Sequence, residues 1–338
     1  MNSKKYTKGL FLVVILAGCE RTDKVVNVSE VKAPSQELKW FVERVRQSLV
    51  FVEGGEFLMG DYGREYGPEK MSYDVDKDSK PVHSVKLSGY SMGEFKVTNL
   101  EYQYYLKING LQLRQVHQAF QKKWEDISSI PNTPAHMDWY EAEQYCAWLA
   151  KITALPFALP TEAQWEYAAR SRGQFLMVAT DDGTYKMTND PVTRDWESGP
   201  RGINISSSWD REAFAKAKGW KTDTFTPLPV DMFPPNPLGM YSMSDNGYEW
   251  VKDWYDPEYY KNSPVNDPQG PEKPVFKDYF GRDTKVVRGQ DFANPAWGGG
   301  VNVHRTAAEP HGYRNKEEIA FLTTKTARCA VNSATPIK

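Results

Sequence analysis

The sequence predicts a loop-rich domain made of short helices and short strands. The chain of 338 residues contains 11 tryptophans, 19 tyrosines, 24 glycines and 22 prolines. Such a composition suits loops built around aromatic clusters better than it suits a helix bundle. Apolar residues alternate only over short runs, and the clearest helical segments begin at recognisable N-terminal caps. We see no internal repeat and no low-complexity tract.

The first residues predict export and attachment of a lipid. Three lysines precede an apolar run from Leu10 to Ala17, as in a signal peptide. This run is shorter than the roughly 20 residues that a permanent membrane helix needs. It leads into Leu-Ala-Gly followed by Cys19, which resembles the bacterial lipobox. The alternative is an ordinary secretory signal that happens to contain a cysteine.

The lipobox divides the chain into three predicted parts. Residues 1–18 would be the signal peptide, and residues 19–36 would be the lipidated cysteine and a flexible polar tether. The folded domain would occupy residues 37–334. Glu20 follows the cysteine, and the absence of aspartate there favours the outer membrane, with the domain facing the periplasm. We therefore expect a protein of the cell envelope that contacts the membrane through the lipid on Cys19.

Charge and cysteine content narrow the possible partners. The 42 basic and 44 acidic residues nearly balance, and no basic block suggests a nucleic-acid partner. Two cysteines remain after Cys19, namely Cys146 and Cys329. An even pair in an exported domain indicates a disulfide, the alternative being two buried free thiols.

Periodicity and caps predict the order of the elements. The N-terminal half should contain a helix over 37–49, two strands around a glycine turn over 51–60, a polar loop over 61–80, and strands over 82–87 and 90–97. Three capped helices should follow: Asn99–Ile108 after Thr98 with Glu101, Trp139–Ile152 after Asp138 with Glu141, and Glu162–Arg170 after Thr161. Residues 171–235 give no assignment, and short strands are expected from Val286 on.

Several segments together resemble the formylglycine-generating enzyme family, also called the sulfatase-modifying factor family. The matching segments are Gly54–Gly60, Phe95–Tyr102 (the family's "EVTNAEY"), Trp139–Cys146, Leu159–Arg170, and Phe233–Tyr255. The resemblance implies a compact α+β fold related to C-type lectins, with little regular secondary structure. Relatives bridge the positions of Cys146 and Cys329, so it also implies that these two cysteines form a disulfide.

The resemblance further implies two calcium sites. The first would use the side chains of Asn204 and Asp223 with the carbonyls of Ile205 and Phe225. The second would use Asn246, Glu249 and the carbonyl of Gly247. Oxygen ligands of this kind suit a hard cation. The alternative for each site is a solvated turn.

The residues for the family's chemistry are missing. Enzymes of this family oxidise a cysteine of a client sulfatase with copper held by two cysteines, which follow an "RGGS" turn. Here the turn beginning at Arg288 has Asp291 in place of the serine, and no cysteine lies between Cys146 and Cys329. Glu309 stands where the family has its substrate-binding arginine. Because thiolates are the ligands that select Cu(I), we expect no copper and a domain without this catalysis.

A rebuilt metal centre is the alternative in which the domain remains an enzyme. Four candidate ligands fall in the region that forms the family's active cleft: Asp291, His304, Glu309 and His311. Two histidines and one carboxylate can hold iron, so an active metal-dependent oxidase is conceivable. The simpler interpretation is that these residues line the wall of a cleft without binding a metal.

The favoured function is therefore protein binding on an enzyme scaffold that has lost its catalysis. The partner could be a secreted toxin that the protein neutralises, as an immunity protein does, or an envelope or secretion complex. Loops carry recognition on such scaffolds, and the candidate surfaces are residues 61–80, 112–126, 171–200 and 256–285. Glycan or peptidoglycan binding, by analogy to lectins, is a third hypothesis.

Overall fold

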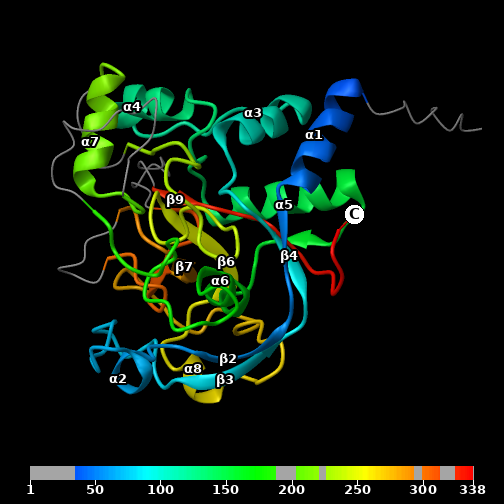
Figure 1. Ribbon diagram of the computed structural model, residues 1–338. Coiled ribbons are helices and arrows are strands. Elements are labelled where there is room, and N and C mark those ends of the chain that lie inside the picture. The colour runs from blue at the N-terminus through cyan, green and yellow to red at the C-terminus, as the bar shows by residue number, and fades with distance from the viewer. Residues whose placement is uncertain (1–34, 188–202, 221–225, 293–298, 313–323, 338) are drawn as a thin grey trace, which may run out of the picture.

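The protein is described by a computed structural model that covers residues 35–187, 203–220, 226–292, 299–312 and 324–337 (Figure 1). Cys19, the predicted signal peptide and nearly all of the predicted tether lie outside these residues. Within the described ranges, no helix has the length and apolar character needed to cross a membrane.

In the described part of the chain, ten short strands form three small sheets. The first has the order β1 (Leu49–Val52), β4 (Tyr90–Gly93), β10 (Ala330–Val331), β5 (Phe157–Ala158). The second pairs β2 (Gly55–Met59) with β3 (His83–Leu87). The third has the order β8 (Arg305–Ala308), β7 (Lys285–Arg288), β6 (Tyr248–Trp254), β9 (Lys325–Thr326), with β9 parallel to β6. The mixture of helices with small sheets confirms the predicted α+β class.

The strand–turn–strand predicted over 51–60 is present, but its two strands do not pair with each other. β1 pairs with β4, whereas β2 pairs with β3 in another sheet. The chain changes sheets at Gly54, where a Cβ atom would lie 2.4 Å from the Leu87 carbonyl oxygen. Only glycine permits so close an approach of two backbones.

Eight helices are described, and the longer ones lie mostly on one side. These are α1 (Gln36–Gln47), α3 (Asn99–Ile108), α4 (Gln118–Ser128), α5 (Trp139–Thr153), α6 (Glu162–Ala169) and α7 (Ser208–Ala217), with the single turns α2 (Gly63–Tyr66) and α8 (Tyr259–Asn262). Figure 1 shows α1, α3, α4, α5 and α7 at one end and the β2–β3 pair at the other. Helix α6 lies between them and contacts β2, β3, β6 and β7.

The three capped helices are confirmed. Thr98 and Asp138 each form a capping box with the predicted glutamate, and Thr161 forms one with Gln164. Several boundaries shift by one to four residues; for example, the first helix ends at Gln47 because Leu49 already belongs to β1, and the strand from Tyr90 ends at Gly93. Helices α4 and α7 were not predicted, although a Ser207–Asp210 capping box precedes α7.

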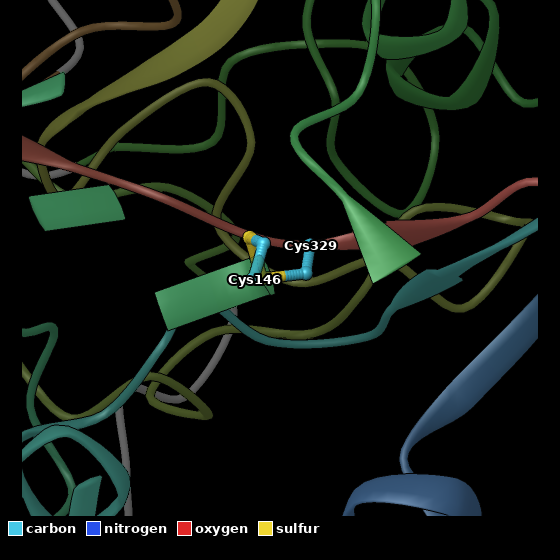
Figure 2. The surroundings of a disulfide bond; sticks show 2 residues. All are labelled: Cys146 and Cys329. Atoms are coloured by element: carbon cyan, nitrogen blue, oxygen red, sulfur yellow. A yellow bond between two sulfur atoms is a disulfide. The ribbon is translucent and has the colours of Figure 1, made fainter. Parts of the chain in front are cut away.

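A disulfide between Cys146 and Cys329 joins two distant parts of the chain, as the resemblance implied (Figure 2). Cys146 lies in α5 and Cys329 directly precedes β10. Both are buried in a core cluster that packs α1, α3 and α5 against the strands. The bridge therefore fixes the helical side of the domain to the first sheet.

Candidate functional site

The four predicted cleft residues do not meet at one point. His304 directly precedes β8 and Glu309 directly follows it. The four residues of β8 lie between them, so their Cα atoms are roughly 16 Å apart. One ion therefore cannot bind both His304 and Glu309, and a centre of two histidines and one carboxylate would need another carboxylate than Glu309 if it used His304.

Asp291 and His311 occupy two further environments. Asp291 is half-buried and lies near α7, where the Arg211 guanidinium donates to its backbone carbonyl at 2.5 Å. Burial raises the pKa of the Asp291 carboxyl, although nearby Arg211 opposes the shift. His311 stacks on Tyr140 of α5 with ring centroids 4.4 Å apart, and its backbone N–H donates to Glu309.

His304 lies instead against two aspartates of the polar loop 61–80. Its Nδ1 is 3.3 Å from Asp74 Oδ2, and ligand atoms of His304, Asp74 and Asp76 all lie within 4.8 Å of one another. Burial raises the pKa of Asp74, but the hydrogen bond and charge of His304 lower it further, so the net value is below the ordinary one. Within the described ranges this is the one histidine–carboxylate group that is close enough to share an ion.

This grouping was missed by the sequence reasoning, which treated residues 61–80 only as a candidate binding loop. One signal was available, because Asp74, Asp76 and Asp78 alternate as carboxylates do in some cation-binding loops. Nothing in the sequence indicated that His304 folds back onto this loop.

A buried network of ion pairs holds α6 at the centre of the domain. Glu162 accepts from Arg305 at 2.7 and 2.8 Å and from Arg288 at 2.7 Å. Glu166, one turn later, accepts from Arg288 at 2.7 Å and from Arg170 at 2.8 Å. All five side chains are almost fully buried. The network joins α6 to β7 and β8, so its role is structural.

Comparison with known proteins decides the family. A model of the sulfatase-modifying factor enzyme 1-like domain matches residues 37–321. This chain is a member of the sulfatase-modifying factor family. A formylglycine-generating enzyme of Streptomyces coelicolor is 28% identical over 265 residues, which cover 68% of this chain and 76% of that enzyme.

Other similar proteins show how widely the domain is used. The serine/threonine-protein kinase pkn1 of Chlamydia caviae is 28% identical over 68% of this chain, but the match spans only 32% of the kinase. The solved structure of PvdO from Pseudomonas aeruginosa has a TM-score of 0.56 at 23% identity, over 84% of this chain and 93% of that one. Variable protein 1 of Treponema denticola has a TM-score of 0.51 at 17% identity, over 84% and 95%. The structures share the fold.

The second predicted calcium site of this sulfatase-modifying factor domain does not fit a calcium ion. The Lys96 ammonium donates to Glu249 Oε1 at 2.6 Å and to the Gly247 carbonyl at 3.0 Å. Arg328 donates to both oxygens of Glu249, at 2.6 and 2.9 Å. The amide of Asn246 bonds the backbone of Leu228. Calcium needs 6–8 oxygen ligands, and here two protein cations already neutralise the carboxylate.

The sequence contained a signal for this difference. Lys96 stands at the glutamate of the family's "EVTNAEY" pattern, so the charge is inverted beside Glu249. Burial lowers the pKa of Lys96 to about 8, and the adjacent Glu249 opposes that shift. The Lys96–Glu249 ion pair thus lies where the second calcium site was predicted.

The first predicted calcium site lies partly outside the described residues, because Asp223 and Phe225 are not among them. Asn204 accepts from the Lys186 backbone N–H at 2.8 Å and donates to Asp181 at 2.7 Å. Ile205 is buried. The site stays a prediction.

His136 provides a pH-dependent contribution to stability. It is 4% exposed, and neither ring nitrogen has a hydrogen-bond partner among the residues that the structure describes. Burial, reinforced by nearby Arg211 and Arg114, lowers the pKa of His136 to about 3. Between pH 3 and pH 6.5, the ordinary pKa of histidine, the unfolded chain therefore binds a proton that the folded chain does not. The free energy of unfolding thus decreases as the pH is lowered through this range.

We expect His136→Asn to reduce this acid sensitivity. Between pH 7 and pH 5 the wild type should lose about 2 kcal/mol more unfolding free energy than the variant. Urea unfolding at both pH values measures the difference. His311→Asn, on the exposed turn after β8, is the control and should keep the wild-type pH dependence. Parallel curves for wild type and His136→Asn would contradict the assignment.

Proposed function

We propose that this protein is a lipid-anchored envelope protein whose sulfatase-modifying factor domain binds a protein partner and does not oxidise thiols. One observation supports the loss of catalysis above others. The chain has three cysteines, and the two in the folded domain are joined as Cys146–Cys329. Copper held by two thiolates needs two free cysteine thiols, and the cysteines of the folded domain are both in the disulfide.

The lipid anchor is the second part of the proposal. It rests on the charged residues, apolar run and lipobox-like sequence that lead to Cys19. With Glu20 following the cysteine, we place the protein at the outer membrane, facing the periplasm. Metabolic labelling with a radioactive fatty acid should mark the wild type, and Cys19→Ala should abolish the label. Labelling that persists in Cys19→Ala would contradict the anchor.

A turn within 256–285 supports the binding role. Lys277 and Asp283 pair across it, and their side chains lie 2.7 Å apart. Asp278 accepts from the backbone N–H groups of Phe280 and Arg282, both at 2.9 Å. Between these anchors, Tyr279 is 97% exposed and Phe280 is 70% exposed. The turn thus holds two large aromatic side chains in solvent.

Such a turn suits a protein partner. Exposed aromatic side chains on an ordered backbone lose little entropy on binding, and tyrosine is enriched at interface hot spots. The Arg282 guanidinium lies 4.8 Å from the Phe280 ring, so a cation accompanies the aromatic pair. The partner we propose is a folded protein of the periplasm, either a secreted toxin or a component of an envelope complex.

We expect the double substitution Tyr279→Ala with Phe280→Ala to reduce partner capture at least tenfold, because hot-spot truncations cost about 2 kcal/mol or more. The measurement is a pull-down from the organism's own envelope and secreted fractions, with bound proteins quantified by mass spectrometry. Trp209→Ala on α7 is the control, since Trp209 is 50% exposed and lies elsewhere. Capture unchanged in the double variant, or lost equally in Trp209→Ala, would refute this surface.

A metal-dependent oxidase is the second candidate. The His304 group with Asp74 and Asp76 is the observation in its favour. Stoichiometric iron or copper, together with oxygen consumption that is lost in His304→Ala, would favour this candidate over the binding role.

A further inference from the structure

We propose that Asp74, Asp76 and His304 form a site for a divalent first-row transition metal, which ties loop 61–80 to the start of β8. The site does not depend on the partner-binding proposal. Its three possible ligand atoms lie within 4.8 Å of one another, although the residues come from opposite ends of the sequence.

The spacing of buried Asp74 and half-buried His304 matches a shared ion. Two ligands about 2.1 Å from one metal, at tetrahedral or octahedral angles, lie about 3.0–3.4 Å apart. His304 Nδ1 and Asp74 Oδ2 are 3.3 Å apart. Asp76 is exposed, and one of its carboxylate oxygens already lies within 4.8 Å of ligand atoms of the other two residues.

Asp74 is the observation that distinguishes this group from an ordinary acidic cluster. Its side chain is almost fully buried, and within the described ranges its Oδ2 has no hydrogen bond of normal geometry beyond the 3.3 Å contact with His304 Nδ1. A buried carboxylate oxygen with so little compensation is costly. A cation at Oδ2 would satisfy it.

The surroundings orient the ligands as metal sites require. The Asp76 backbone N–H donates to Asp74 Oδ1 at 3.0 Å, which leaves Oδ2 as the atom nearest His304. His304 Nε2 lies 3.0 Å from the Thr306 hydroxyl. If Nε2 carries the proton, the Nδ1 lone pair faces Asp74. Metal-binding histidines ordinarily use their second nitrogen in this way.

Lys80 shapes the loop without occupying the site. Its ammonium donates to the backbone carbonyls of Asp74 at 2.7 Å and Asp76 at 2.6 Å, and it lies 3.3 Å from an Asp61 oxygen. The lysine therefore binds main-chain oxygens of the loop, while the side-chain oxygens of Asp74 and Asp76 remain within reach of His304.

The ligand set indicates the class of metal. One imidazole with two carboxylates suits Zn²⁺, Mn²⁺ or Fe²⁺ better than Ca²⁺, which prefers oxygen, or Cu(I), which prefers sulfur. Three protein ligands leave positions open on the ion, and the exposed side of Asp76 gives access from solvent. A ligand from water or from a bound molecule would complete the shell.

The test is metal binding by the untagged full chain after removal of metals with a chelator. Equilibrium dialysis against Zn²⁺ or Mn²⁺, followed by elemental analysis, should give one ion per chain. His304→Ala and Asp76→Asn should each weaken binding at least tenfold, and Thr306→Val should weaken it about tenfold through the second nitrogen of His304. Asp76 is exposed, so its variant should keep the wild-type far-ultraviolet circular dichroism spectrum. Ca²⁺ in excess should not displace the ion.

His311→Ala is the matched control, because it removes a histidine outside the group and should leave binding unchanged. Absorption of bound Co²⁺ provides a second readout and should be lost in His304→Ala. No stoichiometric metal in the wild type would overturn the proposal and would leave His304 and Asp74 as a simple ion pair. Binding that is equal in wild type, His304→Ala and Asp76→Asn would overturn it as well.

Discussion

Replacing Glu162 with glutamine is expected to lower the free energy of unfolding by about 3–5 kcal/mol. Glu162 is buried and accepts three hydrogen bonds from Arg288 and Arg305. The Tyr260 hydroxyl donates a fourth to Glu162 Oε1, at 3.3 Å. Burial raises the pKa of Glu162, but the two arginines lower it further and keep the carboxyl charged. Glutamine preserves the size of the side chain but removes the charge, so the buried guanidinium of Arg305 loses the carboxylate that neutralises it.

Chemical denaturation of both proteins at pH 7 measures this effect. Glu53→Gln is the control, because Glu53 pairs with Arg172 at the surface, where the two side chains are 70% and 44% exposed. Exposed pairs contribute about 0–1 kcal/mol. Equal effects of the two substitutions would show that the buried network is not what holds α6.

Removing the disulfide should have an effect of similar size. The bridge closes a loop with a sequence separation of 183 residues. In the chain-entropy model, a loop of this length restricts the unfolded chain enough to stabilise the fold by about 5 kcal/mol. The double variant Cys146→Ser with Cys329→Ser should therefore unfold at much lower denaturant concentration.

The same comparison has an internal control. Cys19→Ala changes the remaining cysteine, which lies before the folded domain, and should leave the unfolding curve of the purified chain unchanged. Dithiothreitol should lower the stability of the wild type toward that of the double variant. A double variant within 1 kcal/mol of the wild type would contradict a stabilising role for the bridge.

Local chemistry explains which elements were predictable. A capping box needs residues only three positions apart, so Thr98, Asp138 and Thr161 mark the starts of their helices in the sequence itself. Strand pairing depends on distant segments. The sequence therefore shows that strands surround Gly54, but not that β1 and β2 belong to different sheets.

The same distinction applies to the site. Matching motifs picked out Glu249 and Asp291 along the chain, but the contacts of these residues come from distant segments. Glu249 is neutralised by Lys96 and Arg328, which lie far from it in the sequence. The resemblance predicts His304 and Glu309 in one cleft, but strand β8 lies between them and keeps them apart. The fold instead brings Asp74, from a distant loop, next to His304.

The central claim is that this scaffold no longer performs copper-dependent oxidation of a cysteine. The most direct measurement incubates the full chain, supplied with copper and oxygen, with a peptide containing the client cysteine motif of sulfatases. Mass spectrometry then follows conversion of that cysteine to an aldehyde. We predict no more aldehyde than copper alone produces, because Cys146 and Cys329 are bonded to each other. Aldehyde formed in proportion to the amount of protein would contradict the claim.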